Sequence, residues 1–176
     1  NPKFTEETKE GFNLVHNENG ETLGYSPTSE ISILTVDRLA FKDLNKNGTL
    51  DPYEDWRLTA DERANDLASK MSVEQIAGLM LYSAHQSIPG GGNSFFGAVT
   101  YNGKPYDESG AKPSDLSDPQ KKFLLEDNLR HVLITSVESP SISAQWNNNA
   151  QSLVEGVGPG IPINTSSDPR HGSDSY

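Results

Sequence analysis

Residues 118–165 read DPQKKFLLEDNLRHVLITSVESPSISAQWNNNAQSLVEGVGPGIPINT, and this stretch decides the fold class. The apolar run His131–Val137 is predicted to be a strand, and a helical pattern precedes it. A second helix follows, glycines break it at 156–160, and Ile161–Thr165 is predicted to be a second strand. That helix is marked by apolar residues at helical spacing: Ile142, Trp146, Ala150 and Leu153. Alternating helices and strands indicate a parallel α/β arrangement.

Two further helices are predicted upstream, because both starts carry a capping-box pattern. Thr59 with Glu62 marks the first start, and Ser72 with Gln75 marks the second. Each helix has an apolar stripe that is expected to face a core. The stripes are Ala64, Leu67, Ala68 and Met71 in the first helix, and Val73, Ile76, Ala77, Met80 and Leu81 in the second.

The remaining segments are less regular. Short strands are predicted at Phe12–Val15, Thr22–Tyr25 and Ile31–Val36. Residues 85–117 are rich in Gly, Pro, Ser, Asn and Asp and show no periodicity, which indicates either a functional lid or a mobile insertion. Order returns at Asp118, predicted as the cap of a helix with proline at its first position.

Composition excludes several classes of protein. A net charge of −11 argues against nucleic acid or an anionic membrane surface as a partner, since both need a basic face. No apolar run approaches the roughly 20 residues of a membrane helix. The absence of cysteine excludes disulfides and thiol catalysis. The chain starts at Asn1 without a leader, so we expect that any signal peptide has been removed.

The segment Asp43–Glu54, DLNKNGTLDPYE, fits the calcium loop of an EF-hand position by position. Gly48 is sixth, where the chain must turn sharply, and Leu50 is the apolar anchor. The predicted ligands are Asp43, Asn45, Asn47, the backbone carbonyl of Thr49, Asp51 through water, and Glu54. Calcium prefers about six to eight hard oxygens, and alternate residues of a tight loop can aim at one point.

We interpret this ion as structural, tying the amino-terminal segment to the helix after Trp56. Only one such loop is present, whereas regulatory EF-hands work in pairs, and the flank Ile31–Ala40 is strand-like. The alternative is a solvated acidic turn without an ion. A glycosylation sequon, Asn47-Gly48-Thr49, lies inside the loop, and a glycan there would conflict with calcium binding.

A second candidate site follows the last predicted strand, where residues 160–172 read GIPINTSSDPRHG. An apolar strand here runs straight into Asp168, Arg170 and His171, and α/β folds place their sites at the carboxyl ends of parallel strands. The Asp168 carboxylate can accept hydrogen bonds from hydroxyl groups, while the arginine and histidine can hold it ionised or donate to a ligand. The alternatives are that Asp168 caps the next helix and that His171 is structural.

Three stretches of the chain resemble family 3 glycoside hydrolases of the β-glucosidase kind. Arg63–Met80 is similar to the opening helix pair of that family, and Trp146–Gly160 is similar to the helix before its second barrel strand. Ile161–Gly172, with DPRHG at 168–172, resembles the strand and loop at its sugar pocket and is the most specific of the three.

The resemblance implies a fold as well as an activity. Residues 57–176 are expected to begin a (β/α)8 barrel, with 85–117 as an insertion, and 1–56 to form an extension that holds the calcium loop. At 176 residues the chain is too short to close such a barrel, which takes about 250. Family members are retaining, exo-acting enzymes with an aspartate nucleophile and a glutamate acid/base, carboxylates that lie about 5–5.5 Å apart in retaining chemistry.

Those two carboxylates belong to later parts of the family's chain, so we expect no catalytic residue and no activity in this chain alone. Asp168 would bind hydroxyls of the terminal sugar, and Arg170 and His171 would support the loop or line the pocket edge. The lysine–histidine pair with which the family also binds sugar has no match before Tyr176.

The expected function is removal of terminal non-reducing sugars from β-linked glycans by a secreted or periplasmic enzyme. Its partners would be a β-linked oligosaccharide and the remainder of the same polypeptide, and hydrolysis itself would need no cofactor. The alternatives are a non-catalytic calcium-binding module, such as half of a dockerin, and a relative that only binds glycans. A dockerin repeats its loop, and the sequence holds no second copy.

Overall fold

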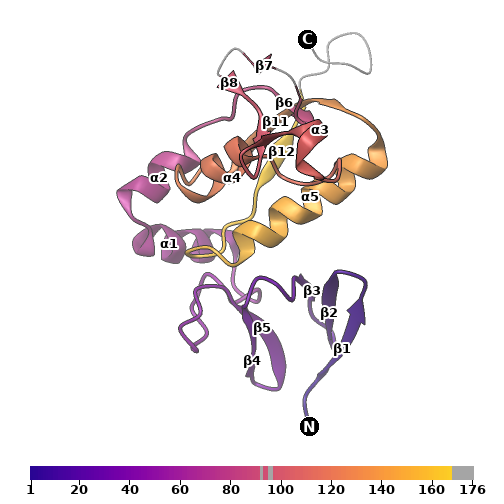
Figure 1. The fold of residues 1–176 in the computed structure, drawn as a ribbon. Coiled ribbons are helices and arrows are strands. Elements are labelled where there is room, and N and C mark those ends of the chain that lie inside the picture. Colours follow the sequence, from indigo (N-terminus) through magenta and orange to yellow (C-terminus); the bar gives the residue numbers. More distant parts are fainter. Residues whose placement is uncertain (92, 95–96, 168–176) are drawn as a thin grey trace. The chain divides into compact units, whose positions relative to one another are not determined.

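The computed structural model describes residues 1–91, 93–94 and 97–167, and Figure 1 follows them along the chain. The chain forms two compact units, which are described separately. Unit 1 contains Asn1–Ser72 and Ser152–Ile161, and unit 2 contains Val73–Gln151 and Pro162–Tyr176. The architecture is mixed α/β with several small sheets, and the described residues contain no closed barrel.

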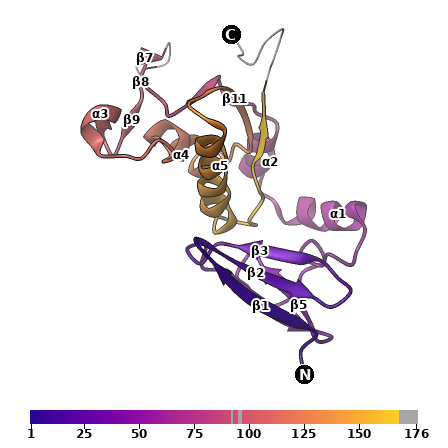
Figure 2. The same cartoon turned by 90° about the vertical axis from the view of Figure 1, so that its right-hand side faces the viewer.

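Unit 1 is built on antiparallel strands and one helix. Its elements are β1 (Phe4–Lys9), β2 (Phe12–Asn17), β3 (Thr22–Tyr25), β4 (Ser32–Val36), β5 (Leu39–Asp43) and α1 (Ala60–Lys70). Figure 2 shows β1, β2 and β3 side by side in a meander, while β4 and β5 form a separate hairpin. The three predicted strands are confirmed as β2, β3 and β4, and the Thr59 capping box is present at the start of α1.

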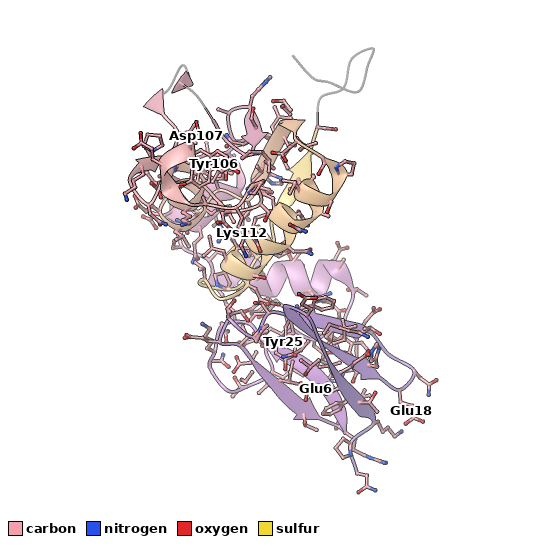
Figure 3. All side chains as sticks on the ribbon, turned by 45° about the vertical axis from the view of Figure 1, so that its right-hand side comes forward. Glu6, Glu18, Tyr25, Tyr106, Asp107 and Lys112 are labelled. Atoms are coloured by element: carbon pink, nitrogen blue, oxygen red, sulfur yellow. The ribbon has the colours of Figure 1, made fainter. Side chains whose placement is uncertain are left out.

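A buried asparagine joins the two β elements of unit 1. Asn17, at the end of β2, donates from Nδ2 to the Ala40 carbonyl oxygen at 3.2 Å and accepts at Oδ1 from the Ala40 N–H at 2.7 Å. The Asn17 side chain thus takes the place of a backbone partner for β5, and both polar backbone groups of Ala40 are hydrogen-bonded. Tyr25 of β3 donates to Glu6 of β1 at 2.7 Å, and both side chains are labelled in Figure 3.

Unit 2 is built around a parallel sheet. Its elements are α2 (Val73–Leu79), β6 (Gln86–Ile88), β7 (Asn93–Ser94), β8 (Gly97–Ala98), β9 (Thr100–Tyr101), β10 (Lys104–Pro105), α3 (Tyr106–Ser109), α4 (Asp118–Leu125), β11 (His131–Val137), α5 (Pro140–Glu155) and β12 (Asn164–Ser166). The sheet has the order β12-β11-β6, and both pairings are parallel. The strands of this sheet therefore lie in chain order, and the chain between each pair contains helices, with the short strands β7–β10 also between β6 and β11.

One strand of this sheet was not predicted. Regular structure is present in 85–117, where the sequence shows no periodicity: Gln86–Ile88 forms β6 and pairs with Ile134–Val137 of β11, and β9, β10 and α3 follow. The role of the segment as a lid or an insertion stays a prediction. Three residues with a single aliphatic side chain carry no periodic signal, so the pairing comes from tertiary contacts. The predicted strand His131–Val137 has the bounds of β11, whereas β12 is shorter than predicted.

The helix after residue 117 is capped differently from the prediction. The cap is Ser117, whose side chain accepts from the Gln120 N–H while the Gln120 side chain accepts from the Ser117 N–H, a complete capping box. Asp118 lies inside the helix, and its carboxylate accepts from Thr100, Asn102 and Gly103 at 2.7–2.9 Å. Asp118 thus fixes the hairpin β9–β10 to the start of α4.

Buried Gln120 also links α4 to its neighbours. Its Oε1 accepts from the Trp146 indole N–H of α5 at 3.0 Å, and its Nε2 donates to Gln86 of β6 at 3.3 Å. Trp146 is fully buried, as is Val132 of β11. The core of unit 2 therefore combines apolar packing with a satisfied polar chain that runs from α5 through α4 to the sheet.

The apolar stripes of α1 and α2 do not face a core, contrary to the prediction. No residue of α1 is buried, and in α2 only Gly78 is buried. Val73 and Met80 are 77% and 82% exposed. Helical spacing identifies the apolar face of a helix but not the element that covers it. Among the described elements, none buries the apolar face of α1 or that of α2.

An ion pair with one buried partner, Asp55, follows the acidic loop of unit 1. Arg57 contacts Asp55 at 2.7 Å and Asp37 at 2.9 Å, and its guanidinium lies 4.8 Å from the ring centre of Phe41. Only 11% of the Asp55 side chain is exposed. Hydrogen bonds from Arg57 hold the pKa of Asp55 below its usual value despite burial, so folding favours the ionised carboxylate.

The first prediction concerns this carboxylate. Because the pKa of Asp55 is lowered on folding, its contribution to stability is complete above the usual carboxyl pKa and is lost as the pH falls through the lowered value. Asp55→Asn should reduce the free energy of unfolding by about 1–2 kcal/mol at pH 7, and by less as the pH approaches 3. Urea unfolding in a calcium chelator measures this, with exposed Glu18→Gln as the control. A deficit that stays constant down to pH 3 would contradict it.

Candidate functional site

The acidic loop lies in unit 1, between β5 and α1, and its first residue is the last residue of β5. As predicted, a strand and not a helix precedes it. The loop turns at Lys46 and Gly48, whose φ angles of 60° and 76° are left-handed. Glycine suits position 48, because a side chain at this φ angle is strained however much space surrounds it.

Two buried carboxylates close the loop from its ends. Asp43, 2% exposed, accepts from the N–H groups of Asn47 and Gly48, each at 3.0 Å. Glu54, 4% exposed, accepts from the Leu44 N–H at 2.7 Å and from the Asp51 N–H at 3.1 Å. The Asn45 N–H also donates to Glu54, at 3.3 Å. Asp43 thus satisfies two backbone donors and Glu54 three, and each brings a negative charge to the inside of the loop.

A third carboxylate, Asp51, binds the side chains of the two asparagines in the loop. Its Oδ2 accepts from the side-chain amides of Asn45 at 2.6 Å and Asn47 at 2.7 Å. Burial favours the neutral acid, but these two bonds and the ammonium of Lys70, 3.4 Å away, hold the pKa of Asp51 below its usual value. The side chains at the predicted third, fifth and ninth positions are therefore hydrogen-bonded to one another, whereas those at the first and twelfth bond backbone N–H groups of the loop.

Helix α1 supports the loop from outside. Arg63 donates to the Tyr53 carbonyl oxygen at 3.0 Å, and Asp66 accepts from the Tyr53 N–H at 3.1 Å. Lys70, one further turn along, bridges Asp66 and Asp51. This spacing puts the three side chains of α1 on one helix face, so the helix fixes the residues just before Glu54.

The donor types fit a calcium ion. Three carboxylates, two amide side chains and one backbone carbonyl are hard oxygen donors, and three negative charges offset a divalent cation. Tyr53, 5% exposed, has a buried hydroxyl with no hydrogen-bond partner among the described residues. Burial and the charge of Glu54 raise its pKa, so it stays a neutral donor beside the loop. Within residues 1–91, 93–94 and 97–167, no group of three or more His, Cys, Asp and Glu side chains is already arranged around a metal position.

The predicted sugar-binding residues Asp168, Arg170 and His171 lie outside the described residues. The strand that leads to them is described: Asn164, Thr165 and Ser166 of β12 pair in parallel with the start of β11. The Asn164 N–H donates to the Arg130 carbonyl oxygen at 2.8 Å. Segment 168–172 thus follows the carboxyl end of a parallel strand, the position from which the site was predicted.

Sequence reasoning missed a polar cluster beside this strand. The Tyr82 ring stacks on His131 with ring centres 5.6 Å apart, and its hydroxyl lies 2.7 Å from Ser166 Oγ. Asn164 Nδ2 lies 3.3 Å from His131 Nδ1. Tyr82 is 55% exposed. The four residues come from three places in the sequence, and only the strand pairing reveals that they are neighbours.

Unit 2 also has a hollow of about 350 Å³ near α3. Its lining is mainly small and polar: Tyr101, Asn102, Ser109, Gly110, Ala111, Asp115, Leu116, Lys121 and Asn149. The phenol of Tyr101 does not point into it as a free group, because its oxygen accepts from the Gly90 N–H at 2.8 Å. No predicted site residue lines this hollow.

Comparison with known proteins gives one informative relative. No protein-family model matches the chain. A periplasmic beta-glucosidase/beta-xylosidase from Dickeya chrysanthemi is 41% identical to it over 140 residues. The match covers 78% of this chain and 19% of that protein, so the chain spans about a fifth of the length of its relative. This identity supports the predicted relationship to β-glycosidases, whereas membership of family 3 stays a prediction.

Proposed function

We propose that this chain is the amino-terminal part of a retaining, exo-acting β-glycosidase that removes terminal non-reducing sugars from β-linked glycans. The observation that carries the proposal is the 41% identity to a protein named as a beta-glucosidase/beta-xylosidase. The segment DPRHG at 168–172 adds support, because it resembles the sugar-pocket loop of family 3 glycoside hydrolases.

The order of the parallel sheet supports the first portion of a (β/α)8 barrel in residues 57–176. In such a barrel the strands of the sheet lie side by side in chain order, as β6, β11 and β12 do, with the short hairpins β7–β8 and β9–β10 inserted between β6 and β11. The exposed apolar residues of α2 fit the same proposal, since further chain of the same polypeptide would cover them. Residues 1–56 would precede the barrel as an extension.

The proposed chemistry divides the work between this chain and the rest of the polypeptide. Asp168 would accept hydrogen bonds from hydroxyls of the terminal sugar, with Arg170 and His171 beside it. The nucleophile and the acid/base would lie about 5–5.5 Å apart, in the rest of the polypeptide outside this chain. No carboxylate of this chain is assigned to either role.

A structural calcium ion in the loop 43–54 is the second part of the proposal. The ion would be held by side chains of Asp43, Asn45, Asn47 and Glu54, by the Thr49 carbonyl, and by Asp51 through water. The charge of the ion, instead of the hydrogen bonds described above, would hold these oxygens together. It would hold β5 against α1 and take no part in hydrolysis.

The proposed location is the periplasm or the outside of the cell, supported by the word periplasmic in the name of the relative. Within the part of the chain that the structure describes, no helix is both long and apolar enough to cross a membrane. Calcium outside the cytoplasm reaches millimolar levels, which fill even a weak loop.

The second prediction tests hydrolysis. The full-length product of the gene should release nitrophenol from nitrophenyl β-glucoside or β-xyloside, whereas the 176-residue chain alone should not. Asp168→Asn in the full-length enzyme should lower kcat/KM by about 100-fold or more, because sugar hydroxyls lose a charged acceptor. Asp61→Asn, at an exposed position in α1, is the control and should stay near wild type. A folded full-length protein that binds glycans but cleaves none of these substrates would favour the non-catalytic module.

The third prediction tests the ion. Isothermal titration should show one calcium ion per chain with a Kd at or below about 1 mM. Glu54→Gln should weaken binding by about 10-fold or more, since it removes the bidentate carboxylate. Glu18→Gln, at an exposed position labelled in Figure 3, should change nothing. If calcium binding released no heat and calcium did not shift the melting temperature, the loop would be a solvated acidic turn without an ion.

A further inference from the structure

Glu155, the last residue of α5, makes two buried interactions within unit 1. Its Oε1 lies 2.7 Å from the Lys42 ammonium, and its Oε2 accepts from the Ser26 N–H at 2.8 Å. Only 13% of the Glu155 side chain and 25% of the Lys42 side chain are exposed. An ion pair this enclosed is held in one geometry by its surroundings, unlike an exposed pair.

Two loop residues contact the same short segment. Lys46 donates to the Gly156 carbonyl oxygen at 3.1 Å. Leu44 lies against Gly160, where an added Cβ would come within 3.0 Å of the leucine Cβ. Gly160 also has a φ of 69°, so both its shape and its backbone conformation require glycine.

The other end of the segment is equally close to unit 1. A Cβ at Gly156 would lie 2.6 Å from the Ser29 carbonyl oxygen, a distance that real Cβ atoms do not show. Residues 155–160 are therefore held along their length by the backbone that precedes β4, by Lys42, and by the calcium loop itself.

The position of these contacts in the sequence links them to the ion. Lys42 and Leu44 flank Asp43, the first predicted ligand. Lys46 lies between Asn45 and Asn47, the predicted ligands at loop positions three and five. A cation that fixes the ligands fixes the backbone from which all three contacts are made. Two events that depend on one backbone conformation are thermodynamically coupled, and the coupling acts equally in both directions.

We propose that Glu155 is a positioning residue that couples the loop 43–54 to residues 155–160, so that a cation in the loop orders this segment. This inference rests on the proposed calcium site and goes beyond it. The segment continues along the chain into β12 and then into the predicted sugar-binding residues. The cation would thereby act on the chain that leads to the substrate, without contacting substrate itself.

Hydrogen–deuterium exchange in the full-length protein tests the coupling directly. Calcium should slow amide exchange in peptides that cover 152–161 by about 10-fold, besides slowing it in the loop. In Glu155→Gln the loop should still be protected by calcium, but 152–161 should not. By reciprocity, titration should show about 5-fold weaker calcium binding in this variant.

Glu126→Gln is the matched control, because Glu126 makes an exposed ion pair with Lys122 at 3.9 Å. It should keep the wild-type exchange and the wild-type Kd. Lys42→Met is a second variant, which breaks the pair but leaves the Glu155 bond to the Ser26 N–H. It should reproduce the loss of protection even if Glu155→Gln does not fold.

The possible results separate the two proposals. Absence of calcium binding in the wild-type protein would overturn both the site and the coupling. Calcium binding that protects the loop but leaves 152–161 unchanged would overturn the coupling alone. Protection of 152–161 that persists in both Glu155→Gln and Lys42→Met would overturn the role of Glu155.

Discussion

Closure of the loop 43–54 by two buried carboxylates is the constraint on which unit 1 depends. Asp43 accepts from two backbone N–H groups and Glu54 from three, so these donors of the twelve-residue loop are satisfied without regular secondary structure. The strand β5 ends at the first carboxylate, and the Tyr53 backbone beside the second is held by α1. Truncation of either side chain to alanine would leave buried N–H donors without acceptors.

Unit 2 shows how much a polar core residue can organise. Gln120 completes the capping box of α4, accepts from Trp146 of α5 and donates to Gln86 of β6. Each of its partners comes from a different element, so the glutamine fixes one relative arrangement, which apolar packing alone does not specify. In the parallel sheet β12-β11-β6, β12 ends at its carboxyl end, the end of parallel strands at which α/β proteins bind ligands.

The sequence predicted features that are encoded locally and missed those that depend on distant partners. The Thr59 capping box and the bounds of β11 follow from short-range patterns, and both are confirmed. Strand β6 has no pattern of its own, and it exists because β11 offers backbone partners. Ser117 took the capping role expected of Asp118, because that aspartate is engaged by the hairpin β9–β10. The loop ligands were placed by spacing, but the role of α1 in holding them was not visible.

The lysines around the loop argue for a modest calcium affinity. Lys70 lies 3.4 Å from Asp51, so its ammonium group shares the field of the carboxylates that are predicted to bind calcium. At about 7 Å in water, a single positive charge repels a divalent cation by about 1 kcal/mol, which weakens binding several-fold. Glu155 offsets the charge of Lys42, and Asp66 offsets that of Lys70. The charges of the loop are thus balanced without an ion, and the proposed calcium site would be filled where calcium is plentiful.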